Sequence, residues 1–105
     1  MAYVMFQYDG PNDSHRWNEY NQQVRDWIAQ LLQIPGAVSF VAYRTSDGAS
    51  LDTITMLEFR TVEETRGAQA SEQLRKVLDR LQPVGVTAQV LLVERSPFTP
   101  EPIPA

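Results

Sequence analysis

The chain has 105 residues, of which 13 are acidic, 9 are basic, one is histidine and none is cysteine. A chain of this length fits one domain with one hydrophobic core. The missing cysteines exclude disulfides, thiolate catalysis and cysteine-ligated metal clusters, and the net charge of −4 argues against nucleic acid as a partner, because phosphate binding requires a clustered positive face. We expect no metal site, since one histidine cannot form a polyhistidine centre.

The first residues form an aromatic and apolar run, residues 3–9, which predicts a strand that ends in a turn at residues 9–13. This start lacks the basic region of a signal peptide, and no apolar run in the sequence approaches the length of a membrane span. The sequence therefore predicts a cytoplasmic protein that does not interact with a membrane.

Two helices are predicted from the spacing of apolar residues. Asp13 is a candidate N-cap for the first, in which apolar residues recur at three- and four-residue steps until Pro35-Gly36 ends the helix. The second begins at Thr61, because residues 61–64 form a capping box in which the Glu64 carboxylate reaches back to the Thr61 amide. Gly67 weakens the first half of this helix, so any bend is expected there.

Three further strands are predicted at residues 37–44, 51–60 and 87–94, with a hairpin loop at residues 46–50. The order β-α-β-β-α-β is that of an α+β, ferredoxin-like fold, with a four-stranded antiparallel sheet and two helices on one face. This single domain spans residues 1–95. Residues 96–105 contain four of the seven prolines and form a proline-rich tail, which we expect to wrap a partner subunit.

The alternation of side chains along a strand divides each strand into two sets. We assign one set to the helices: Val4, Phe6, Tyr8, Val38, Phe40, Ala42, Ile54, Met56 and Glu58. The opposite, open face then carries Tyr3, Met5, Val41, Tyr43, Leu57 and Phe59. So much exposed apolar surface is unusual on a monomer, which predicts a homodimer through the open sheet face. The remaining residues of that face would keep the interior partly polar and leave room for a ligand cavity: Gln7, Ser39, Thr53 and Thr55.

A resemblance to a known family rests on two patterns. The first helix ends in Ile34-Pro35-Gly36 directly before a strand, and the strand at residues 56–59 runs into the acidic helix start Glu63-Glu64. In these features the chain, up to about Arg95, resembles the dimeric α+β barrel superfamily. That superfamily includes cofactor-independent antibiotic biosynthesis monooxygenases, haem-degrading enzymes, muconolactone isomerases, polyketide cyclases and EthD-like proteins. The resemblance implies a ferredoxin-like domain that pairs into a dimeric barrel.

Within this resemblance, residues 17–24 are similar to an EthD-like segment that carries a Trp–Tyr pair and a histidine four residues after the tyrosine. Val24 stands at the histidine position, so the imidazole suspected of acid–base work in that group is missing here. The second helix has no histidine either, which removes the axial ligand of the haem-degrading relatives. The resemblance thus implies no haem, and no cofactor is expected. Phe59 stands where relatives place a cavity-lining aromatic residue.

The candidate ligand contacts combine the open face with the start of the first helix: Tyr3, Gln7, Tyr43, Phe59, Trp17 and Asn18. A tyrosine hydroxyl inside an apolar cavity needs a partner, so Tyr3 and Tyr43 could bind a ligand or bond across the dimer interface. His15 is the one side chain with an ordinary pKa near neutrality, although an exposed turn position explains it better than a catalytic base. No catalytic residue is assigned.

Three functions fit these observations. The first is an enzyme similar to cofactor-independent monooxygenases, isomerases or cyclases, which acts on a small apolar aromatic compound through desolvation and positioning. The second is a binding module that holds such a ligand without turnover. The third is a structural homodimer with a filled interior. The missing internal histidine weakens the first, and the polar residues assigned to the inner face weaken the third.

Overall fold

The computed structural model describes residues 1–10, 14–45 and 52–105, with the backbone alone at residues 14–17. The predicted Asp13 cap and the predicted hairpin loop at 46–50 therefore lie outside the described residues. The elements follow the predicted order, except that the second helix is divided. They are β1 (Ala2–Tyr8), α1 (Ser14–Leu32), β2 (Ser39–Arg44), β3 (Thr53–Phe59), α2 (Val62–Gln69), α3 (Glu72–Leu81), the short 3-10 helix η1 (Gln82–Val84) and β4 (Gln89–Glu94).

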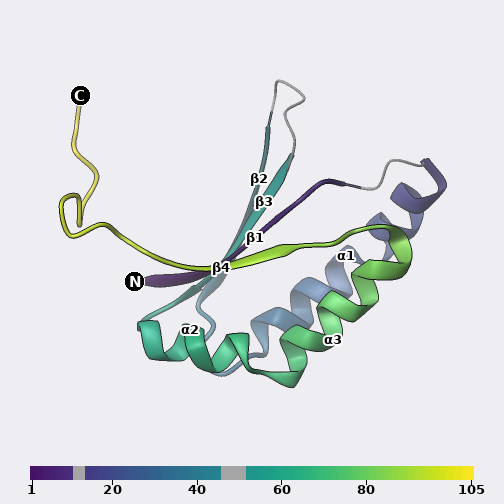
Figure 1. The fold of residues 1–105 in the computed structure, drawn as a ribbon, viewed down its shortest axis with the longest axis horizontal. Helices are drawn as coiled ribbons and strands as arrows, with labels where there is room; N and C mark the ends of the chain where they lie inside the picture. The colour runs from purple at the N-terminus through teal and green to yellow at the C-terminus, as the bar shows by residue number, and fades with distance from the viewer. Residues whose placement is uncertain (11–13, 46–51) are drawn as a thin grey trace.

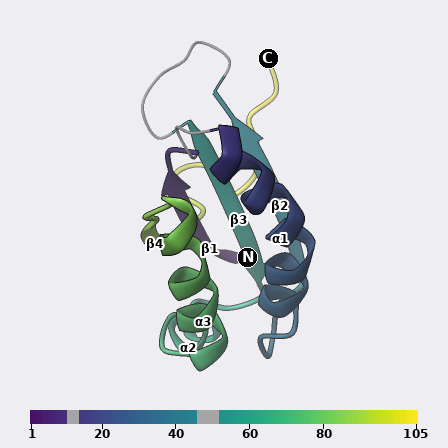
Figure 2. The same ribbon diagram turned by 90° about the vertical axis from the view of Figure 1, so that its right-hand side faces the viewer.

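The four strands form one antiparallel sheet in the order β2-β3-β1-β4. β1 is therefore an inner strand between β3 and β4, while β2 and β4 are the two edges. All helices lie on one face of this sheet and leave the other face open (Figure 1 and Figure 2). The predicted α+β, ferredoxin-like arrangement is thus confirmed. None of the helices in the described ranges is both long enough and apolar enough to span a membrane.

The second helix breaks at Ala70 and Ser71, three to four residues beyond the bend expected at Gly67. Ser71 begins α3, since its hydroxyl oxygen accepts from the Leu74 backbone N–H at 3.2 Å. The same hydroxyl donates to the Ala68 carbonyl at 2.6 Å, which satisfies a group at the end of α2. Ser71 thus caps α3 and closes α2 at the same point, which accounts for the position of the break.

The predicted cap at Thr61 is present, with one difference. The Thr61 hydroxyl oxygen accepts from the Glu64 backbone N–H at 3.2 Å, as expected. The Glu64 carboxylate was expected to accept from the Thr61 backbone N–H, whereas in the structure it accepts from the Thr61 hydroxyl at 3.1 Å.

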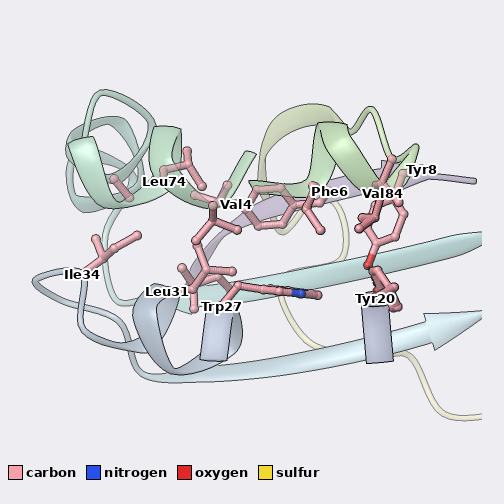
Figure 3. Close-up of a cluster of buried hydrophobic side chains, with 14 of the residues drawn as sticks. Val4, Phe6, Tyr8, Tyr20, Trp27, Leu31, Ile34, Leu74 and Val84 are labelled. Carbon is pink, nitrogen blue, oxygen red and sulfur yellow. Dashed lines mark hydrogen bonds between the residues drawn. The ribbon is translucent and has the colours of Figure 1, made fainter. Parts of the chain in front are cut away.

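The core lies between the helices and the sheet (Figure 3). β1 and β3 contribute alternate residues, and α1 and α3 contribute residues at helical spacing, so each element buries one face only. The fully or nearly fully buried members include Val4, Phe6, Leu57 and Phe59 from the strands and Trp27, Leu31, Leu74, Val77 and Leu81 from the helices.

The predicted faces are right for β1 and β2 and wrong for β3. Leu57 and Phe59 are both 0% exposed and face the helices, whereas Ile54 and Met56 are half-buried on the opposite side. Register explains the reversal, because Leu57 lies opposite both Val4 and Phe40, which face the helices. We use the name open face for the residues on the uncovered side: Tyr3, Met5, Gln7, Ser39, Val41, Tyr43, Ile54, Met56, Glu58, Gln89, Leu91 and Val93.

Candidate functional site

The candidate residues on the open face form one pair and one outlier. Gln7 of β1 and Tyr43 of β2 both lie opposite Ile54 of β3, so they flank the same residue. Tyr3 lies four residues before Gln7 on β1, about 13 Å away along the strand. Gln7 makes a weak hydrogen bond from Nε2 to the Met5 sulfur at 3.5 Å, and Tyr43 is 57% exposed. The open face therefore presents these side chains without assembling them into an enclosed site.

The other three candidates do not join this group. Phe59 lies on the helix side of the sheet, so the expectation that it shares a face with Tyr3 and Tyr43 is wrong. Asn18 is exposed on α1. The side chain of Trp17 lies outside the described residues. The role of all six residues as ligand contacts stays a prediction.

A buried pair of tyrosines lies instead between α1 and the sheet. The hydroxyl of Tyr8, from the end of β1, meets the hydroxyl of Tyr20, from α1, at 2.8 Å, and either can be the donor. Figure 3 shows the two rings meeting tip to tip at one end of the core. No local pattern in the sequence indicates this pair, because the two residues stand on different elements.

Burial raises the pKa of both tyrosines above the ordinary value of 10.0. Desolvation is the largest cause for each, and the hydrogen bond between them raises the pKa of Tyr8 further. The nearby Arg44 charge acts in the opposite direction, and that of Asp52 in the same direction. Both phenols therefore keep their protons at neutral pH, so the pair can form hydrogen bonds but cannot serve as a base.

Aromatic rings continue from this pair along α1 toward β2. The rings of Tyr20 and Trp27 are 6.0 Å apart and tilted by 54°, and the rings of Trp27 and Phe40 are 6.0 Å apart at 76°. Such tilted and edge-on arrangements are favourable for aromatic pairs. These rings form a continuous aromatic part of the core on the helix side of β1 and β2.

Two polar atoms inside this region have no hydrogen-bond partner. They are Nε1 of Trp27 and Oγ1 of Thr55, both buried. Thr55 lies between Phe6 and Ala42 in the sheet, on the face that α1 covers. A buried polar atom without a partner is costly, so it commonly marks a place where water or a ligand binds. We name Tyr8, Tyr20, Trp27 and Thr55 the α1–sheet site.

Asp52 directly precedes β3, at the end of the sheet next to this site. Its Oδ1 accepts from the Gly10 backbone N–H at 3.1 Å and from the Thr53 hydroxyl at 2.9 Å, while its own N–H donates to Asp9 Oδ1 at 3.4 Å. These bonds tie the end of β1 to the start of β3, where Thr53 lies opposite Tyr8. The backbone at Tyr8 is therefore fixed, because Tyr8 pairs with Thr53 and the two residues after it bond to Asp52. Among residues 1–10, 14–45 and 52–105, no group of three or more histidine or acidic side chains is arranged to hold a metal ion.

Comparison with known proteins supports the fold. No family model matches the sequence, and no curated protein matches it. Among solved structures, an EthD family protein from Bacillus halodurans superposes with a TM-score of 0.72 at 12% identity, covering 91% of this chain and 99% of that chain. A candidate antibiotic biosynthesis monooxygenase from Deinococcus radiodurans gives 0.67 at 13% identity, covering 100% of this chain and 98% of that one.

SnoaB, a cofactor-independent oxygenase from Streptomyces nogalater, gives a TM-score of 0.63 at 17% identity, covering 95% of each chain. Identities this low establish the shape of the chain and leave its chemistry open. The resemblance seen in the sequence is therefore confirmed for the architecture: the chain has the ferredoxin-like fold of the EthD-like and antibiotic biosynthesis monooxygenase-like proteins.

Proposed function

We propose that this protein is a cofactor-independent enzyme that oxidises a small apolar aromatic compound, of the anthrone or phenol type, bound at the α1–sheet site. The observation that carries the proposal is that two buried polar atoms on the helix side of the sheet, Trp27 Nε1 and Thr55 Oγ1, lack a hydrogen-bond partner. Trp27 shares its core cluster with the hydrogen-bonded tyrosines Tyr8 and Tyr20. The likeness in fold to SnoaB, a cofactor-independent oxygenase, supports the reaction class.

The chemistry follows from what these groups can do. Both tyrosines stay protonated, so the substrate must lose its proton through its own acidity, and the site must stabilise the resulting oxyanion. The Trp27 N–H and the Thr55 O–H are suited to donate to that oxygen in a site that excludes water. Molecular oxygen then converts the CH₂ group of an anthrone to a carbonyl; one oxygen atom enters the product and the other leaves as water.

An oxygen electrode with anthrone and hydroxyanthrone substrates tests this proposal. We expect oxygen uptake matched by quinone formation, with kcat/KM reduced by about tenfold or more in Thr55→Val or Trp27→Phe, since each removes one hydrogen-bond donor. Lys76→Ala, an exposed change on α3, is the matched control and should leave kcat/KM unchanged. Equal rates in all four proteins would assign the uptake to uncatalysed oxidation.

A binding module without turnover is the second candidate function. It is favoured by the α1–sheet site itself, in which both tyrosines hold their protons at neutral pH. Trp27 lies in the site, so a bound aromatic ligand should quench its fluorescence. Measured in a Trp17→Phe background, quenching that saturates without oxygen uptake would support the module over the enzyme.

We also propose that the protein forms a homodimer through its open face. Met5 and Met56, neighbours on the two inner strands, form the apolar centre of this face, and Glu58 is the one charged side chain among its described residues. A nearly uncharged apolar surface can meet its own copy about a two-fold axis without placing like charges together. Tyr3, Gln7 and Tyr43 would then lie within the interface.

Sedimentation or light scattering at micromolar concentration tests the dimer. We expect twice the chain mass for the wild type and the chain mass for Met56→Glu, which places a charge at the centre of the face. Gln73→Glu, at an exposed position on α3, adds the same charge elsewhere and should leave the dimer intact. A wild-type monomer would exclude the dimer.

A further inference from the structure

A groove lies between the turn that follows α1 and the helix α2. Its larger part is a cavity of about 460 Å³ that reaches from Ile34 to Gly67, and its smaller part is a cavity of about 400 Å³ that includes Arg60. Gly36 and Glu64 line both cavities, so the two parts adjoin. Each part has the volume of a typical small-molecule site. We name the two parts together the α2 groove.

The α2 groove is separate from the site and the surface described above. Ile34, which lines the groove, stands at the end of the core away from Tyr8 and Tyr20 (Figure 3). None of the residues that line the groove belongs to the open face. Binding in the groove therefore depends neither on the proposed oxidation nor on the proposed homodimer.

Gly67 keeps the larger cavity free of a side chain. It lies inside α2, where glycine destabilises a helix relative to alanine. Its φ is not in the left-handed region, and a Cβ added to it would have no heavy atom within 4 Å. Neither backbone strain nor packing in the described ranges explains this glycine. Space for a ligand does explain it, because a side chain at this position would occupy part of the cavity.

Two opposite charges line the groove without pairing with each other. The half-buried Glu64 accepts from the Thr61 hydroxyl through Oε1, while its Oε2 lies against Gly36 and has no hydrogen bond from any residue that the structure describes. Arg60 likewise has no hydrogen-bond or ion-pair partner among residues 1–10, 14–45 and 52–105. A ligand with one cationic and one anionic group can therefore satisfy both side chains.

We propose that the α2 groove binds a free α-amino acid with an apolar side chain. The ammonium group donates to Glu64, the carboxylate pairs with Arg60, and the side chain occupies the larger cavity between Ile34 and Gly67. Charge-assisted hydrogen bonds of this kind are stronger than bonds between neutral groups. A free amino acid fits the two charges because it carries both on one carbon, whereas a residue within a peptide has amides in their place.

Isothermal titration calorimetry of the full chain with L-leucine tests the class of ligand. We expect saturable binding with one site per chain. Two analogues of leucine each lack one charge: 3-methylbutylamine has no carboxylate, and 4-methylpentanoate has no ammonium. Each should bind at least about fivefold more weakly than L-leucine. The proposal would be overturned by the absence of saturable binding up to about 10 mM L-leucine, or by equal affinity for either analogue.

Substitutions in and beside the groove test the location. Gly67→Leu should fill the larger cavity and weaken L-leucine binding by about tenfold or more, while Gln69→Leu, at an exposed position on α2 outside the groove, should leave the affinity unchanged. Arg60→Gln should weaken binding by about fivefold or more, and the matched control Arg66→Gln by less than about twofold.

Thermal unfolding shows whether each variant is folded. If Gly67→Leu does not fold, the exposed change Arg60→Gln decides the outcome. Equal affinity for L-leucine in Gly67→Leu, Arg60→Gln and the wild type would place the ligand outside the α2 groove and overturn the proposal.

Discussion

The carboxylate of Glu64 lies directly against the α-carbon of Gly36. A Cβ added to Gly36 would overlap Glu64 Oε2 and lie 2.9 Å from Glu64 Cδ. Gly36 also has a φ of +89°, in the left-handed region that side chains disfavour. The turn after α1 and the first turn of α2 therefore meet at a position that has room for glycine alone, and the same Glu64 side chain accepts from the α2 cap at Thr61.

Gly36→Ala should lower the free energy of unfolding by at least about 1–2 kcal/mol, which is the strain of the left-handed conformation before any overlap with Glu64 is added. Gly67→Ala is the control, since this helical glycine has nothing within 4 Å of an added Cβ. The control should raise the free energy of unfolding by up to about 1 kcal/mol. Urea unfolding of both variants checks the prediction, and equal midpoints would contradict it.

Thr55→Val and Thr53→Val should affect stability differently. The Thr55 hydroxyl is buried without a partner, so its replacement by an isosteric methyl should be neutral or stabilise the ligand-free protein by about 1 kcal/mol. The Thr53 hydroxyl donates to Asp52 at 2.9 Å, and its loss should cost about 1–2 kcal/mol. Thermal unfolding measures both. A loss of stability in Thr55→Val would show that its hydroxyl is bonded, for instance to an ordered water.

The protein should lose stability above about pH 10 through Tyr8. The pKa of Tyr8 is raised by folding from 10.0, so in alkali the unfolded chain releases this proton before the native protein does. The contribution is fully present below pH 10 and falls as pH rises beyond it, by up to about 1.4 kcal/mol per pH unit. The free energy of unfolding, measured with denaturant from pH 8 to 11, should therefore fall less steeply with pH in Tyr8→Phe than in the wild type. Parallel curves would contradict this prediction.

Ser71→Ala should destabilise the protein by about 1 kcal/mol, because it removes the N-cap of α3. Ser71→Gly should cost only a few tenths of a kcal/mol by the capping scale. Hydrogen exchange localises the effect. The Leu74 amide should exchange faster in Ser71→Ala, while the Glu64 amide, bonded to the separate cap at Thr61, should keep its protection.

Much of the fold could be predicted because its signals are local. The apolar periodicity of α1, Pro35-Gly36 at its end and the Thr61 cap each depend on neighbouring residues. The face of β3 could not be predicted, since both sets of its side chains are partly apolar. Leu57 and Phe59 compete with Ile54 and Met56 for the core, and pairing with β1 decides between them.

The candidate site was harder to predict. Tyr8 and Tyr20 meet only after α1 packs on the sheet, so neither residue's neighbours in the sequence indicate the hydrogen bond. The lack of a partner at Trp27 Nε1 and Thr55 Oγ1 is likewise a property of tertiary packing. The sequence pointed to the tyrosines of the open face, because alternation identifies exposed side chains more readily than buried pairs.

The inner position of β1 has a consequence for how the chain is made. β1 precedes both of its partners, β3 and β4, in the chain, and the second of them ends only at Glu94. During synthesis, Val4 and Phe6 leave the ribosome long before the strands that will cover their edges. Until β4 has been made and has paired with β1, this edge of β1 presents unpaired backbone groups, so a chain truncated before β4 should be prone to edge-to-edge association.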